Sequence, residues 1–129
     1  MTSIVWSRSF ETGDLFIDNQ HRKLVSTVNE LGAAYEQCAG RSNIARILND
    51  LTNMSVVHFQ DEIRPSTLDF LPMTSLVRED QRIVSFISRL RIEYINGLCE
   101  ITDHDIMTIA NWLVRHIRII ERAHTAVAV

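Results

Sequence analysis

Apolar residues recur at helical spacing in four long stretches of this chain, and short polar connections separate the stretches. Only 4 glycines and 2 prolines interrupt the pattern, so few positions would break a long helix. We predict helices over residues of about 18–39, 42–64, 75–96 and 103–122. Four helices of about 20 residues with short connections are typical of an all-α, up-down antiparallel four-helix bundle.

An arm of residues 1–17 precedes the first predicted helix. It carries Trp6, Phe10, Leu15 and Phe16, whose apolar side chains we expect to pack over one end of the core. Asp18 is the expected N-cap, because its carboxylate can accept the free N–H groups of a first helical turn.

The third and fourth helices carry their own signals. Thr102 and Asp105 have the spacing of a capping box, with aspartate in place of glutamate, and predict the start of the fourth helix. Two positions on the inner face of the third helix each have two candidate residues. This face is drawn through Leu76, Glu79 or Asp80, Ile83, Phe86 or Ile87, Leu90 and Tyr94.

Composition bounds the protein class. The 129 residues suit one domain, and a hydrophobic fraction of 46% is enough for a buried core. A net charge of −3 is too mild to indicate a nucleic-acid partner, and no run approaches the ~18 apolar residues that membrane insertion needs. The N-terminus lacks the apolar stretch of a signal peptide. Cys38 and Cys99 form no CxxC pair and indicate reduced thiols, so we expect a cytoplasmic protein.

Three of the five histidines fall on core faces of three different predicted helices. His21 lies at the start of the first helix, His58 near the end of the second and His116 late in the fourth. These three helix ends meet at one end of an up-down bundle, so the imidazoles can share a layer. Glu62 follows His58 by one helical turn. Imidazole suits iron, copper and zinc, although a single core histidine is more often simply hydrogen-bonded.

The order of short motifs is more specific than their spacing. "IDNQH" (residues 17–21) follows an arm with Trp6 and Phe10, "HFQDE" spans residues 58–62, and "WLVRHI" (residues 112–117) precedes Glu121. In this order the motifs resemble those of bacteriohemerythrins, and the resemblance covers nearly the whole chain.

The resemblance implies a centre of two non-haem iron ions, bridged by an oxo or hydroxo group. His21 and His58 would bind one iron, which keeps an open position for dioxygen, and His116 would bind the other. Glu62 and Glu121 would bridge the two ions. The family usually has aspartate at the last position, so Glu121 is one methylene longer.

One part of the family pattern is missing. The family's third helix supplies an HxxxH pair to the second iron, whereas residues 73–91 of this chain contain no histidine. Depending on the anchor for the alignment, the pair is replaced by Val77 and Gln81 or by Glu79 and Ile83. The inner face of the helix favours the second choice. We therefore predict Glu79 as a metal ligand, and we expect the second iron to bind more weakly.

These features predict a hemerythrin-like domain that binds dioxygen, peroxide or another small diatomic molecule, or senses oxygen or redox state. We also expect this domain to be part of a longer signalling protein. There it would regulate a fused output domain such as a diguanylate cyclase. The alternatives are a diiron oxidase or peroxidase, a stand-alone oxygen-binding protein and a metal-free bundle. Binding or sensing is favoured over enzymatic activity, which stays open.

Overall fold

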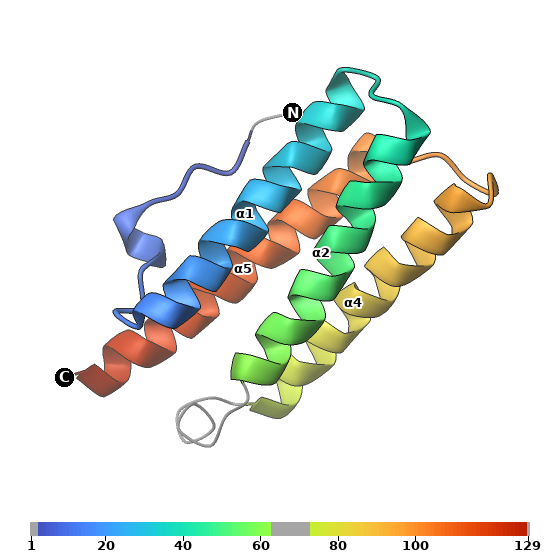
Figure 1. Cartoon of the computed structure of the whole chain (residues 1–129). Coiled ribbons are helices and arrows are strands. Elements are labelled where there is room, and N and C mark those ends of the chain that lie inside the picture. Colours follow the sequence, from blue (N-terminus) through green and yellow to red (C-terminus); the bar gives the residue numbers. More distant parts are fainter. Residues whose placement is uncertain (1–2, 63–72, 129) are drawn as a thin grey trace.

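The computed structural model describes the backbone of residues 3–62 and 73–128, and the side chains of residues 3–60 and 77–124. The described chain consists of helices: η1 (Arg8–Phe10, a short 3-10 turn), α1 (Leu15–Glu36), α2 (Arg41–Glu62), α4 (Met73–Ile95) and α5 (Asp103–Ala128). The four long helices run alternately up and down, and each packs against two others (Figure 1). The predicted four-helix bundle with an N-terminal arm is confirmed.

The start of α1 corrects the predicted N-cap. The helix begins at Leu15, and its cap is Asp14, whose side chain accepts the backbone N–H groups of Phe16 and Ile17 at 3.0 and 3.2 Å. Asp14 caps the helix because the preceding residue, Gly13, is at φ +91° and turns the chain into the helix. Asp18 is thus inside the first turn.

The other helix ends differ from the predicted ranges by smaller shifts or by extra turns. Helix α1 ends at Glu36 rather than at residue 39, and Cys38 follows in the left-handed region at φ 53°. Helix α4 begins two residues before the predicted residue 75, and α5 continues past residue 122 to Ala128. The predicted end of the second helix at residue 64 lies outside the described residues. The predicted capping box is present: Thr102 and Asp105 bond each other's backbone N–H at 3.2 and 3.0 Å.

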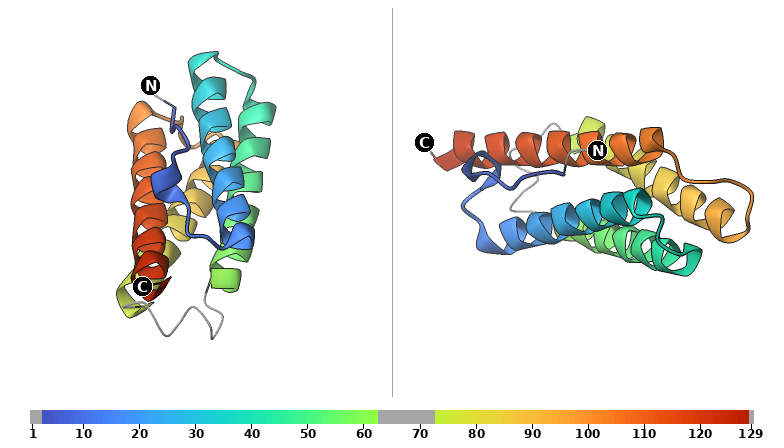
Figure 2. Two further views of the ribbon diagram at one scale, coloured as in Figure 1. Left: turned by 90° about the vertical axis from the view of Figure 1, so that its left-hand side faces the viewer. Right: turned by 90° about the horizontal axis from the view of Figure 1, so that it is seen from above.

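The arm lies along α1 and α5 (Figure 2). Asp18, which is buried, holds it: Oδ1 accepts the backbone N–H and the hydroxyl of Thr12 at 2.9 and 2.8 Å. Phe10 is buried as predicted, with Trp6 edge-on against it. Leu15 and Phe16 are instead 74% and 49% exposed, because the earlier helix start places them on the outer side of the first turn.

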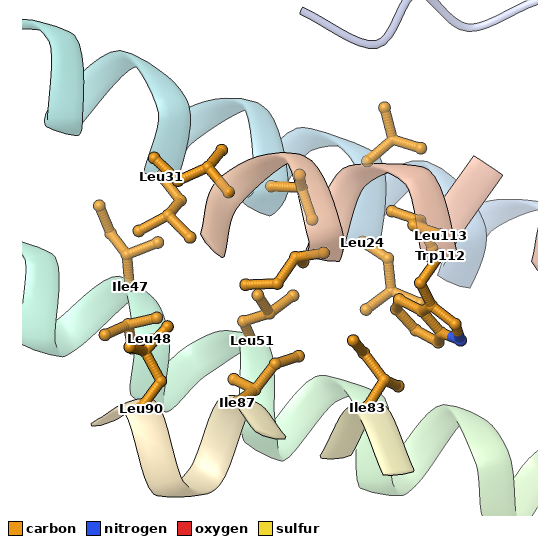
Figure 3. Packing of buried hydrophobic residues seen from close by; sticks show 14 of the residues in the cluster. Leu24, Leu31, Ile47, Leu48, Leu51, Ile83, Ile87, Leu90, Trp112 and Leu113 are labelled. Atoms are coloured by element: carbon orange, nitrogen blue, oxygen red, sulfur yellow. The ribbon is translucent and has the colours of Figure 1, made fainter. Parts of the chain in front are cut away.

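Leucine and isoleucine side chains from all four helices fill the interior (Figure 3). The face of α4 that points inward carries Asp80, Ile83, Ile87, Leu90 and Tyr94, so the two open positions are taken by Asp80 and Ile87. Each fully buried leucine or isoleucine contributes about 1.5–3 kcal/mol to folding. None of the described helices has an apolar stretch sufficient to span a bilayer.

Candidate metal centre

Three imidazoles meet in the interior of the bundle, each from a different helix. His21 comes from α1, His58 from α2 and His116 from α5, and all three are at most 1% exposed. Nε2 of His58 lies 3.0 Å from Nε2 of His21 and 3.3 Å from Nε2 of His116. The donor atoms of the three residues lie within 4.8 Å of one another. The predicted histidine layer is therefore present.

The outer nitrogens of two of these rings are held by oxygen atoms. Nδ1 of His58 lies 2.7 Å from Oε1 of Gln20, and Nδ1 of His116 lies 3.1 Å from Oδ1 of Asp80. An ionised carboxylate or an amide oxygen can only accept, so both Nδ1 atoms donate. A neutral imidazole that carries its proton on Nδ1 has a lone pair on Nε2. Gln20 and Asp80 thus direct two lone pairs toward the middle of the cluster.

The Nε2 lone pairs of His58 and His116 are 3.3 Å apart and repel each other unless a positive charge lies between them. A cation in the middle of the cluster removes this repulsion, and neutral imidazole is a good ligand for iron, zinc and copper. The donor set therefore fits a transition-metal ion. The oxygen atoms behind His58 and His116 match the usual surroundings of metal-binding histidines, where a second hydrogen bond fixes the tautomer and the ring orientation.

Asp80 is the member of this site that the sequence reasoning did not identify. It is 6% exposed, and its Oδ1 also accepts from Nε1 of Trp112 at 3.2 Å. The signal was the inner face of the third helix, which left Glu79 and Asp80 as alternatives. The structure turns Asp80 inward, whereas Glu79 pairs with Arg115 at 3.2 Å. Gln20 is the second of these partners; it lies in the "IDNQH" motif, whose spacing predicts no role for it.

The donor atoms that lie within 4.8 Å of one another belong to the three histidines, and the predicted carboxylate ligands are not tested by this grouping. Glu79 and Glu121 both lie outside the group of donor atoms within 4.8 Å, and Glu121 is half-buried on α5. Glu62 is the last residue of α2, and its side chain lies outside the described part. The bridging roles of Glu62 and Glu121 therefore stay predictions.

Aromatic rings cover one side of the cluster, and a cavity reaches its other side. The Phe59 ring centre lies 5.6 Å from that of His58 and 5.4 Å from that of His116, and Trp112 lies 5.5 Å from His116. A cavity of about 290 Å³ lies between α1 and α2, and its lining residues are Gln20, Lys23, Leu24, Asn53, Met54, Val57 and His58. A molecule of a few atoms can reach His58 from this cavity.

The chain is similar to known hemerythrin proteins along most of its length. Residues 12–123 match the family model described as the hemerythrin HHE cation binding domain. A bacteriohemerythrin from Pseudomonas aeruginosa is 26% identical over 121 residues, which cover 92% of this chain and 76% of that protein. A hemerythrin-like protein from Naegleria gruberi is 30% identical over 114 residues, covering 88% of this chain and 83% of its own.

A solved structure supports the fold. The crystal structure of a point mutant superposes with a TM-score of 0.81 at 24% identity, and the match covers 94% of this chain and 93% of that one. The family model spans the end of the arm, α1, α2, α4 and most of α5, and it includes the three clustered histidines. This chain therefore belongs to the hemerythrin family of cation-binding domains.

Proposed function

We propose that this domain binds non-haem iron at His21, His58 and His116, and uses it to bind dioxygen or to sense oxygen or redox state. Membership of the hemerythrin family implies non-haem iron and dioxygen. The observation that carries the proposal is the convergence of three buried Nε2 atoms beside a cavity that opens onto His58.

Bound to these imidazoles, iron would supply a redox-active position that could take a small ligand. The chain's own residues prepare that position. Gln20 and Asp80 hold His58 and His116 in the tautomer that coordinates. Phe59 and Trp112 pack on the rings and keep water from that side of the site. The cavity is lined mainly by apolar side chains such as those of Leu24, Met54 and Val57, with Lys23 and Asn53 also in its wall, and it suits a small neutral molecule.

Sensing is favoured over reversible storage because α4 brings no imidazole to the site. Residues 73–91 contain no histidine, and the inward residue of α4 is Asp80. A centre with fewer nitrogen donors and more oxygen donors or water stabilises ferric over ferrous iron. Such a centre would oxidise in air and would stay in the ferric state for longer than the iron of an oxygen carrier.

A sensor also needs a route to an output. Helix α5 carries His116 and Trp112, and it continues past them to Ala128. We propose that a change of ligand or oxidation state at the iron shifts α5, and that a fused or partner signalling domain responds to that shift. This requires two distinct arrangements of α5, each with its own affinity for the ligand.

The test is reconstitution of the purified protein with ferrous iron under argon, followed by spectra during exposure to air. We expect bound iron and a new near-ultraviolet charge-transfer band that dithionite removes. His58→Ala should lose the band, whereas His104→Ala should keep it, because His104 is exposed at the start of α5. The proposal fails if the unmodified protein retains no iron after desalting, or if its iron gives the same spectrum with and without air.

A further inference from the structure

We infer that the three imidazoles bind one metal ion together, so that the domain holds a single tight ion rather than the two that the family resemblance implies. The inference rests on the proposed function only in that both place metal at His21, His58 and His116. It differs in assigning His116 to the same ion as His21 and His58.

The nitrogen–nitrogen distances fit a shared ion. An ion bound at about 2.1 Å from each imidazole nitrogen separates neighbouring nitrogens by about 3.0 Å at right angles and about 3.4 Å in a tetrahedron. The observed separations from His58 are 3.0 Å to His21 and 3.3 Å to His116. His58 therefore lies beside both other rings at the spacing of ligands on one ion.

The helix that would serve a second ion contributes an outer partner instead. Asp80 is the inward carboxylate of α4, and its Oδ1 accepts from Nδ1 of His116 and Nε1 of Trp112. An oxygen that bonds the outer nitrogen of a metal-binding histidine orients that ligand and raises its basicity. Asp80 is thus a positioning residue for His116, and α4 supports the first ion without binding another.

The charge of the metal ions also favours a single ion. Two divalent ions would bring four positive charges into a buried site, which requires anionic ligands. Among the residues whose side chains are described, the buried carboxylates are Asp18 and Asp80. Asp18 accepts from the backbone and hydroxyl of Thr12, and Asp80 from His116 and Trp112. Both carboxylates are therefore engaged by hydrogen-bond donors of the protein, and three imidazoles suffice to hold one divalent ion.

The number of ions is tested by anaerobic titration of the metal-free protein with ferrous iron. Equilibrium dialysis and elemental analysis give the iron bound per chain, and X-ray absorption gives the neighbours of the iron. We expect one ion per chain at low free iron, three imidazole nitrogens around it and no metal–metal scattering. Two ions per chain taken up at similar free iron, or metal–metal scattering at one equivalent, would overturn the inference.

Histidine variants separate the two arrangements further. If one ion is shared, His21→Ala, His58→Ala and His116→Ala each weaken the binding of the same ion, and none leaves a full tight equivalent. If two ions are bound separately, His116→Ala removes one ion and leaves the other. His104→Ala is the matched control. Circular dichroism of the metal-free variants shows that each remains helical before the titration is interpreted.

Variants on α4 test the role of Asp80. Asp80→Ala should weaken iron binding by about 10–100-fold, and Asp80→Asn, which keeps an accepting oxygen, should recover most of it. The imidazole signals in the absorption spectrum should persist in both. Glu79→Ala is the comparison variant on α4, because it removes the neighbouring carboxylate, which pairs with Arg115. If it weakens binding as much as Asp80→Ala, α4 supplies a ligand and the single-ion assignment is wrong.

The outcomes distinguish this inference from the proposed function. If one ion binds tightly and its spectrum does not change in air, the inference is supported and sensing is contradicted. Two tight ions that respond to air support sensing and contradict the inference. Retention of no iron by the unmodified protein contradicts both.

Discussion

Replacing Asp80 by alanine should destabilise the metal-free protein measurably. The carboxylate is 6% exposed and accepts from the indole N–H of Trp112 and from Nδ1 of His116, both of which are buried. Alanine leaves two buried donors without this acceptor, and each such loss costs about 1–3 kcal/mol. Removing a buried carboxylate returns part of that cost, because its desolvation no longer opposes folding.

We therefore expect a net loss of about 3 kcal/mol in the free energy of unfolding. For a chain of 129 residues, the unfolding entropy near the midpoint converts this loss into a fall in Tm of about 10 °C. Asp80→Asn should lose less than half as much, because one oxygen, Oδ1, accepts both bonds and the amide retains an oxygen.

Urea titrations with excess chelator, followed by circular dichroism, measure both variants against the unmodified protein. Equal m-values would show that the comparison concerns stability rather than the compactness of either state. A loss below about 1 kcal/mol for alanine, or an equal loss for asparagine and alanine, would refute the view that the two buried donors depend on this oxygen.

Three further changes test other parts of the structure. Asp18→Ala should cost about 2 kcal/mol and speed proteolysis of the arm, because Thr12 loses its acceptor; limited proteolysis with mass spectrometry measures this. Leu51→Ala, at a fully buried core position, should cost about 2–5 kcal/mol in urea, and a loss under 1 kcal/mol would contradict the packing. Cys38→Gly should raise Tm by a few degrees, because φ 53° strains a residue with a side chain by about 1 kcal/mol; unchanged calorimetry would contradict this.

The fold was predictable because its signals are long and repeated. Four amphipathic stretches define four helices, and the spacing of Thr102 and Asp105 marks the start of α5 correctly. The start of α1 was predicted wrongly because two aspartates compete for the cap. Asp14 and Asp18 are equivalent in a linear pattern. Only the turn at Gly13 and the bonds from Thr12 to Asp18 show which one caps the helix.

The site was predictable only in part. His21, His58 and His116 could be placed in one layer because up-down topology brings their helix ends together. The role of Asp80 could not, since a helical stripe is wide enough to include either of two neighbouring acidic residues. The choice depends on the rotation of α4 about its axis, which the packing of Ile83 and Ile87 determines. The hydrogen bond between Nδ1 of His116 and Asp80 also joins two helices far apart in the sequence, so no fixed spacing of residues predicts it.

The indole of Trp112 gives this domain a built-in optical probe. Its N–H bonds the carboxylate that holds His116, and its ring lies 5.5 Å from that imidazole. The second tryptophan, Trp6, is on the arm beside Phe10 and the Arg22 guanidinium. In a Trp6→Phe background, emission from the remaining indole would report loading and release of a quenching ion in real time, without any attached dye.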